Sequence, residues 1–192
     1  MTEDMKMTIA ETVAEMIKTR DLDRLTVTSL VEECHISRQT FYYHFHDIND
    51  VIEYLVSANI ASIAKECLEF TNLYDAIHHL VNALSDDRQL LKRALSSQRR
   101  ADIERMLVES TKAALESVYD ELGITAHIDG SGDTVLDFFT YGIVGFLIYG
   151  DLRSHEDIDI VTGRIFNVIK SYMDLEQKKH PRVKRGVFHM RA

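Results

Sequence analysis

Five polar side chains stand close together in one short segment, and their types suit contacts with DNA. They are Arg38, Gln39, Thr40, Tyr43 and His44. An arginine can donate two hydrogen bonds to O6 and N7 of guanine, and a glutamine can pair with N6 and N7 of adenine. Threonine, tyrosine and histidine commonly donate to phosphate oxygens. The segment therefore has the groups needed both to read bases and to hold the phosphate backbone.

These side chains can act together only if a short helix presents them on one face. Phe41 and Phe45 are four residues apart, which makes one side of a helix over residues 38–45 apolar. Ser37 can cap the start of this helix, where free backbone N–H groups also favour an anion. The five polar residues then face outward, with Tyr42 at the border.

A second short helix precedes this one, and either Thr26 or Thr28 can cap it. Its inner face and the following turn are apolar, with Leu30, Val31, Cys34 and Ile36. Two short helices joined by a tight turn are typical of a helix-turn-helix, in which the first helix braces the second for entry into a major groove. The alternative is that Tyr42, Tyr43 and His44 pack on a neighbouring helix. Two adjacent tyrosines and a histidine beside a separate phenylalanine pair cannot all face inward, which favours the DNA interpretation.

The rest of the chain is predicted to be helical as well. Of its 192 residues, 45% are hydrophobic and 28% are charged, and Pro181 is the single proline, so little interrupts helices joined by short turns. Apolar residues recur at helical spacing in nine segments. These are residues 8–19, the two helices of the motif, a helix capped by Asp47 or Asn49 and running to residue 68, and residues 73–84, 86–95, 100–122, 134–149 and 156–175.

Charge is distributed unevenly along the chain. The formal net charge is −9, while residues 178–192 contain six basic and no acidic residues. An acidic chain does not suit a nonspecific nucleic-acid coat, so DNA contacts must be local. No apolar stretch is long enough to span a membrane and no secretory leader is visible. We therefore expect a cytoplasmic protein without a membrane partner, in which Cys34 and Cys67 are reduced.

The segment over residues 26–45 resembles the DNA-binding signature of the TetR family of repressors, and the expected nine helices and the size also agree. The resemblance implies an all-α TetR-like fold with a three-helix DNA-binding head at residues 1–49, a ligand-binding and dimerisation body at 50–177, and a basic tail at 178–192. It places DNA contacts at Arg38, Gln39, Thr40, Tyr42, Tyr43 and His44, with a phosphate contact at Thr28.

Two positions depart from the family pattern. His35 occupies the turn, where the family usually has glycine, and this predicts a left-handed residue at some cost. Ile48 stands where the family often has a lysine, which puts one phosphate contact in doubt. The sequence from Arg38 to Phe45 resembles more closely the subgroup that contains regulators of dihydroxyacetone utilisation, which leaves open a protein effector and activation instead of repression.

The last two predicted helices are too apolar to stay exposed on a small body. The resemblance implies that they pair with their copies as a four-helix dimer interface on a near-palindromic operator; ordinary monomer core is the alternative. The interface positions are then Val135, Phe139, Gly142, Phe146, Ile158, Val161, Ile165, Val168 and Tyr172. Gly142 and Gly145 would permit close approach of helices.

The resemblance also implies a pocket for an effector, either a small molecule or a protein. Candidate lining residues are Tyr74, His78, Met106, Tyr119, Phe138 and Tyr141. We predict no metal, cofactor or catalytic residue, because no nucleotide-binding, hydrolase or zinc motif is present. An enzyme site built from His78, Asp137 and Tyr141 and a helical adaptor or co-activator with weak DNA binding are the competing hypotheses.

Overall fold

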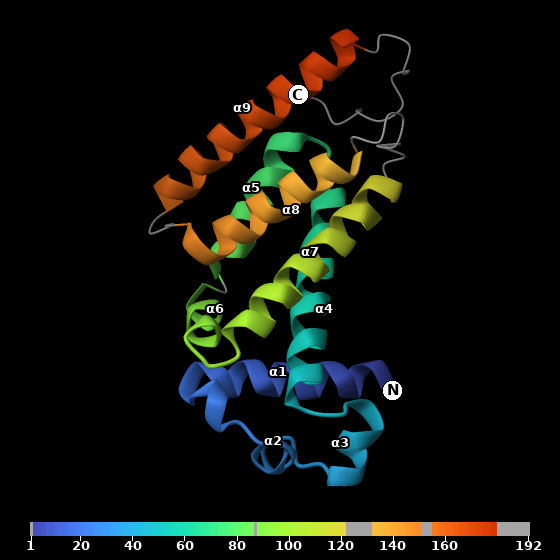
Figure 1. Cartoon of the computed structure of the whole chain (residues 1–192), viewed down its shortest axis with the longest axis vertical. Helices are drawn as coiled ribbons and strands as arrows, with labels where there is room; N and C mark the ends of the chain where they lie inside the picture. The colour runs from blue at the N-terminus through green and yellow to red at the C-terminus, as the bar shows by residue number, and fades with distance from the viewer. Residues whose placement is uncertain (1, 87, 122–131, 151–154, 180–192) are drawn as a thin grey trace. The chain divides into compact units, whose positions relative to one another are not determined.

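The computed structural model describes residues 2–86, 88–121, 132–150 and 155–179. All regular elements in these ranges are helices, which confirms the predicted all-α class (Figure 1). The first elements are α1 (Thr2–Thr19), the 3-10 helix η1 (Leu22–Arg24), α2 (Val27–Glu33), α3 (Arg38–His44) and α4 (Ile48–Leu68). They are followed by α5 (Leu73–Asp86), α6 (Arg88–Leu95), α7 (Arg100–Glu121), α8 (Gly132–Tyr149) and α9 (His155–Lys179). Among the described residues, no helix combines the length and apolarity needed to cross a membrane.

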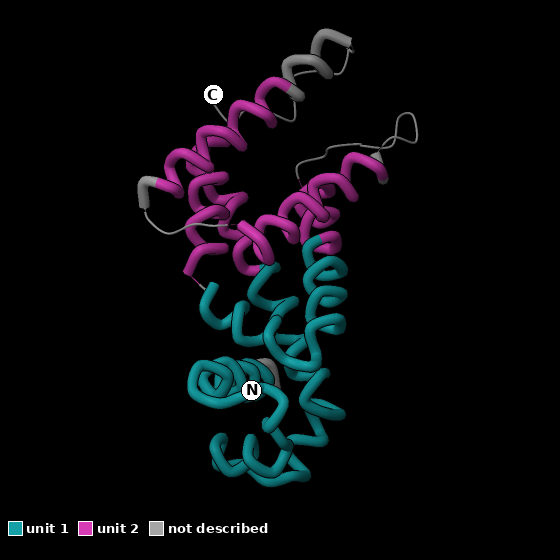
Figure 2. The backbone as a smooth tube through the Cα atoms, turned by 60° about the vertical axis from the view of Figure 1, so that its left-hand side comes forward, with its two compact units in different colours: residues 1–61, 87–111 teal, residues 62–86, 112–192 magenta. Residues whose placement is uncertain are grey.

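Two compact units divide the chain (Figure 2). Unit 1 consists of residues 1–61 and 87–111, and unit 2 consists of residues 62–86 and 112–192. Unit 1 thus contains the predicted head and, in addition, the start of α4, α6 and the first half of α7. The predicted basic tail lies almost wholly outside the described residues.

Unit 1 is built around an apolar stripe on α1. Ile9, Val13 and Met16 follow helical spacing and are buried, since one face of an amphipathic helix packs inward. α1 packs against α2 and α6, and α2 packs against α3. The carboxylate of Asp23 accepts hydrogen bonds from the backbone N–H of Gln98 at 3.0 and 3.1 Å. This contact fixes η1 against the segment that joins α6 to α7.

The core of unit 2 forms where α5 packs against α9. Ile77 and Val81 of α5 are buried together with Ile158 of α9. Further apolar side chains pack on this cluster: Leu73, Phe146, Val161, Ile165, Phe166 and Ile169. The inner stripe of α9 is therefore occupied within its own chain.

The helix starts are explained by local hydrogen bonds. Thr26, one of two predicted caps, begins α2, and Ser37 begins α3 as predicted. Asp47 caps α4, since its side chain accepts from the backbone N–H of Asp50 at 3.0 Å. The segment after α1 forms η1, where the side chain of Asp21 accepts from the backbone N–H of Asp23.

Both cysteines are free thiols in half-buried positions. Burial, and to a smaller extent the negative charge of the neighbouring Glu66, raises the pKa of Cys67 to about 11. Because only the thiolate reacts, we expect Cys67 to be alkylated at pH 8 at least about a hundredfold more slowly than free cysteine. Mass spectrometry of a Cys34→Ser variant treated with iodoacetamide measures this rate. Alkylation as fast as that of free cysteine would contradict the burial described for Cys67.

Candidate nucleic-acid interface

A helix-turn-helix is formed by α2 and α3, and buried side chains brace one helix against the other. Leu30 and Val31 of α2 and Phe41 of α3 are buried, and Phe45, which caps the end of α3, is buried as well. The rings of Phe41 and Phe45 lie 6.2 Å apart. Since the apolar side of α3 is fixed in this way, its opposite side is free to meet a partner.

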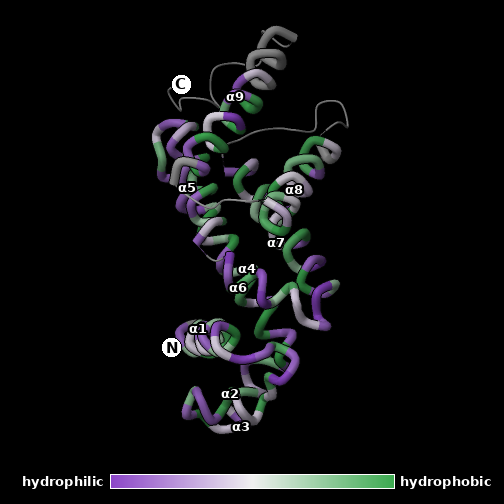
Figure 3. Tube along the Cα trace, turned by 90° about the vertical axis from the view of Figure 1, so that its left-hand side faces the viewer, coloured by the Kyte–Doolittle hydropathy of each residue, from purple (hydrophilic) through white to green (hydrophobic). Residues whose placement is uncertain are grey.

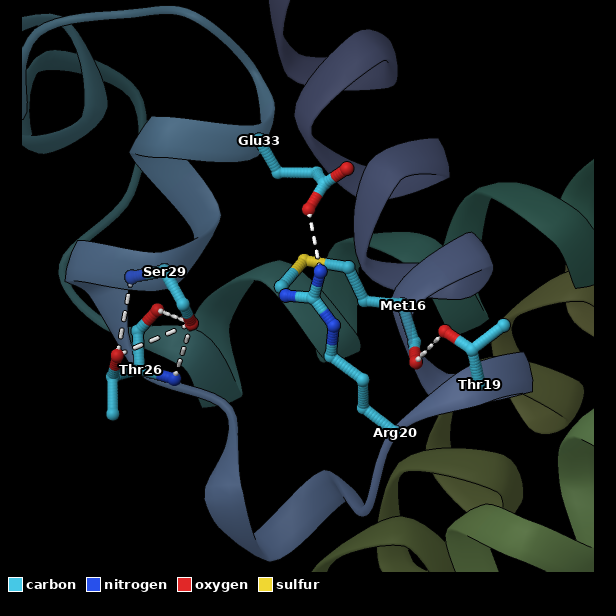
Figure 4. Close-up of polar contacts among 6 residues, drawn as sticks. All are labelled: Met16, Thr19, Arg20, Thr26, Ser29 and Glu33. Atoms are coloured by element: carbon cyan, nitrogen blue, oxygen red, sulfur yellow. Dashed lines mark hydrogen bonds and ion pairs between the residues drawn. The ribbon is translucent and has the colours of Figure 1, made fainter.

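The start of α2 is fixed by a reciprocal pair of hydrogen bonds (Figure 4). The backbone N–H of Ser29 donates to Thr26 Oγ1, and the backbone N–H of Thr26 donates to Ser29 Oγ, both at 3.2 Å. In the same figure Arg20, just after α1, donates to Glu33 on α2 at 2.8 Å. This arrangement is a capping box, and its common sequence pattern has glutamate or glutamine as the second residue. Because this chain has Ser29 there, the capping box could not be predicted from the sequence.

The turn between the two helices depends on one residue in a left-handed conformation. His35 has φ 54°, which confirms the prediction from its position, and Ile36 then donates its backbone N–H to Val31 at 3.0 Å. A side chain with a Cβ atom is strained in this region, whereas glycine is not.

Replacement of His35 by glycine should therefore stabilise unit 1. We expect His35→Gly to raise the free energy of unfolding by about 1 kcal/mol, because relief of strain exceeds the entropy gained by the unfolded chain. Urea denaturation measures the change. His35→Ala is the control, since alanine shares the strain; an equal gain in both variants would contradict this explanation.

The outer side of α3 exposes most of the predicted DNA-binding residues. Tyr43 is 76% exposed and Tyr42 is 58% exposed. Arg38 and Gln39 are exposed as well, while Thr40 and His44 are half-buried. The ring of His44 packs edge-on against Tyr43 at a centroid distance of 4.9 Å. The structure thus brings guanidinium, amide, phenol and imidazole groups together on one short helix.

Hydroxyl groups order the first turns of both helices on this surface. The guanidinium of Arg38 donates from Nη2 to Thr28 Oγ1 at 2.7 Å. Ser37 Oγ accepts from the backbone N–H of Thr40 at 3.0 Å and lies 2.8 Å from Thr40 Oγ1. The link between Thr28 and Arg38 was not predicted, because ten residues separate them and no periodicity relates two different helices.

Three basic side chains of α1 and the residue after it already have partners within the chain. Lys18 is paired with Glu15 at 2.6 Å and Arg20 with Glu33 at 2.8 Å. Lys6 lies over two aromatic rings, at 5.7 and 5.5 Å from their centroids. Exposed pairs of this kind add little stability, but they reduce the positive charge available to phosphates. Arg38, by contrast, donates its hydrogen bond to a neutral group, the hydroxyl of Thr28.

The turn between α3 and α4 is followed by Ile48, where the family often has a lysine, and it is held by hydrogen bonds to Asp50. Ile48 is buried, so its side chain offers no phosphate contact. Asp50 accepts hydrogen bonds from the backbone N–H of His46 at 2.9 Å and from its ring at 3.1 Å. Partial burial alone would raise the pKa of Asp50, but these hydrogen bonds lower it below its usual value. The carboxylate therefore stays ionised and holds the turn at neutral pH.

The predicted effector residues fall in different surroundings. Tyr74 and His78 lie on α5, with their rings stacked at 6.5 Å, and His78 is 3.2 Å from Asp159 of α9. Tyr119 is half-buried on α7, Met106 is buried in unit 1, and Phe138 and Tyr141 are exposed on α8. Within the described residues, no three His, Cys, Asp or Glu side chains gather as a metal site would require. Tyr74 and His78 are thus the pair that the structure brings together.

The predicted dimer residues also divide into two groups. Ile158, Val161, Ile165 and Phe146 pack on the α5–α9 core of their own chain, because the apolar stripe of α9 covers α5. Val168 and Gly142 are exposed, and Val135 and Phe139 are half-buried. The side chain of Tyr172 lies outside the described residues. Four further residues of α8 and α9 are exposed, although they were not among the predicted dimer positions: Phe138, Tyr141, Tyr149 and Ile160.

Comparison with known proteins agrees with this geometry. Residues 9–55, from α1 into α4, match the model of the bacterial regulatory proteins of the tetR family. The fold resembles that of the dihydroxyacetone kinase operon activator DhaS, with a TM-score of 0.62 and 13% identity over 88% of this chain and 96% of that chain. It also resembles the TetR family repressor AlkX from Dietzia sp. strain DQ12-45-1b, implicated in biodegradation of n-alkanes, with a TM-score of 0.61 and 16% identity over 88% and 95% of the two chains. No curated protein matches the sequence significantly.

Proposed function

Because the chain belongs to the TetR family of DNA-binding transcription regulators, we propose that it is an effector-responsive repressor that binds a near-palindromic operator as a homodimer. The observation that carries this proposal is the outer side of α3. Arg38, Gln39 and Tyr43 are exposed there, while Phe41 is buried beneath them. A helix of this kind in the major groove supplies both base contacts and phosphate contacts.

The exposed face of α8 supports dimerisation. Phe138, Tyr141 and Tyr149 are 71%, 63% and 73% exposed. They share one helical stripe with Gly142 and Gly145, where an added Cβ would meet nothing within 4 Å. In Figure 3 the tube of α8 is coloured mainly green and white, so few strongly hydrophilic residues lie along this helix. A stripe of exposed aromatic rings beside open backbone is typical of a protein–protein interface.

Exposed apolar residues of α9 add to this surface in our proposal. Val168 is 64% exposed and Ile160 is also exposed, and the backbone at Gly163 is open in the same way as on α8. We assign the interface to these positions and not to Ile158, Val161 and Ile165, which pack on α5. Since one patch that meets its own copy closes into a twofold pair, the dimer presents two α3 helices to half-sites about 34–36 Å apart.

Of the three buried threonine hydroxyl groups without a hydrogen-bond partner among the described residues, two lie in unit 2, which favours this unit as the place where the effector binds. Thr140 Oγ1 on α8 and Thr162 Oγ1 on α9 have no hydrogen-bond partner within the described part of the protein. Buried polar groups without a partner are uncommon, and a polar ligand or an ordered water satisfies them. We therefore propose a small molecule with hydrogen-bonding groups as the effector, with Tyr74 and His78 of α5, which contact Phe166 and Asp159 of α9, as further candidates for its site.

A salt titration tests the proposed DNA binding. Fluorescence anisotropy follows the protein as it binds a duplex selected in vitro, between about 50 and 200 mM salt. We expect two protomers per duplex and an affinity that falls steeply with salt, because phosphate contacts release counterions. If the protein binds no duplex at any salt concentration, the result would instead support the alternative that it is a helical adaptor acting through protein contacts. A reporter placed behind the same duplex then distinguishes repression from activation.

A further inference from the structure

We propose that Thr28 is a positioning residue for base recognition, whose hydroxyl directs the guanidinium of Arg38 toward a guanine. The inference rests on the proposed function, since it concerns how the same surface reads DNA. Its basis is the hydrogen bond from Arg38 Nη2 to Thr28 Oγ1 at 2.7 Å, which joins the first turn of α2 to the first residue of α3.

Both ends of this hydrogen bond are held by caps. Thr26 and Ser29 fix the first turn of α2, which carries Thr28. Ser37 fixes the first turn of α3, which begins with Arg38. Thr28 and Arg38 are nevertheless exposed, so their hydrogen bond lies on the surface that would face DNA. The backbone at each end is therefore ordered before DNA arrives.

The hydrogen-bonding capacity of the two groups leaves room for DNA. A guanidinium has five N–H donors, of which Thr28 engages one and a guanine needs two. A hydroxyl accepts through its lone pairs and donates through its single proton, so Thr28 can hold Arg38 and donate to a phosphate oxygen at once. One residue would thereby link a phosphate contact, which sets register, to a base contact, which sets specificity.

Orientation of the arginine matters because its side chain is long and flexible. A guanidinium already held in one direction loses less conformational freedom when it pairs with a base. This gain in binding free energy is expected only at the base pair whose base Arg38 contacts. Thr28 should therefore affect discrimination at a single base pair of each half-site, and not the affinity for all DNA equally.

The test uses Thr28→Val, which removes the hydroxyl at nearly constant shape, and Thr28→Ser, which keeps it. The probes are a duplex selected by the wild-type protein and copies in which each guanine in turn is replaced by 7-deazaguanine, which lacks the N7 acceptor. We expect the wild type to lose about tenfold or more in affinity at one guanine of each half-site. Thr28→Val should reduce this discrimination several-fold, and Thr28→Ser should retain it.

Two comparisons separate positioning from a structural or purely electrostatic role. Thr8→Val on α1, where the threonine hydroxyl donates to the Asp4 carbonyl, is the matched control and should bind every probe as the wild type does. Combined with Arg38→Ala, Thr28→Val should no longer change discrimination at the affected guanine. An equal loss on every duplex, or additive effects of the two substitutions, would overturn the inference. If the wild-type protein selects no sequence, the proposed function fails first.

Discussion

Arg38→Ala is expected to lower affinity for the selected operator by about thirtyfold or more while leaving nonspecific DNA binding nearly unchanged. A bidentate contact between arginine and guanine contributes about 1–3 kcal/mol, and a dimer contains two such contacts. Because Arg38 is exposed and its bond to Thr28 lies at the surface, its removal should change the stability of the fold by less than about 0.5 kcal/mol. Titration of the operator and of an unrelated duplex measures both affinities.

The matched control for this substitution is Arg24→Ala. It removes the same charge from η1, an exposed position outside α3. If Arg38 reads a base, its substitution leaves the salt dependence of binding almost unchanged, whereas loss of a phosphate contact reduces the slope by about one. Equal losses of affinity in Arg24→Ala and Arg38→Ala would show that only charge matters, which would contradict base recognition by α3.

Val168→Glu is expected to convert the proposed homodimer into a monomer. Val168 is 64% exposed on α9 and belongs to the proposed interface, so two copies of a carboxylate would have to be buried there. Desolvation of unpaired carboxylates costs several kcal/mol, so the dimer dissociation constant should rise more than about a hundredfold. Sedimentation equilibrium at several protein concentrations measures it. The monomer should also lose operator affinity, since it can hold only one half-site.

Ala113→Glu is the control for Val168→Glu, because it adds the same carboxylate at an exposed position of α7. We expect this variant to remain dimeric. Ile165→Glu should behave differently from both, since Ile165 packs on the α5–α9 core and a charge there should unfold unit 2. A Val168→Glu variant that stays dimeric would place the interface on another surface.

The head could be predicted closely because its signals are local. The spacing of Phe41 and Phe45 gives the buried side of α3, and Ser37 marks its start within a few residues. The left-handed turn at His35 was implied by the family resemblance, since the family usually has glycine at this position. Short-range hydrogen bonds and side-chain periodicity determine all of these features.

The faces of α8 and α9 could not be predicted in the same way. The heptad-like spacing of Ile158, Val161 and Ile165 shows that one side of α9 is buried, but periodicity does not say by which partner. In the structure α5 is that partner, while Ile160 and Val168 of α9 remain exposed. The link between Thr28 and Arg38 was hidden for a related reason, since it depends on how two helices cross.

The most direct test of sequence-specific recognition by α3 is selection of genomic DNA fragments by the purified wild-type protein, with Tyr43→Ala in parallel. Tyr43 is the most exposed ring on α3, so its loss should spare the fold and remove contacts to DNA. We predict that the wild type enriches fragments sharing a short near-palindrome and that the variant does not. Equal enrichment by both proteins, or none by either, would contradict the assignment of α3 as the recognition helix.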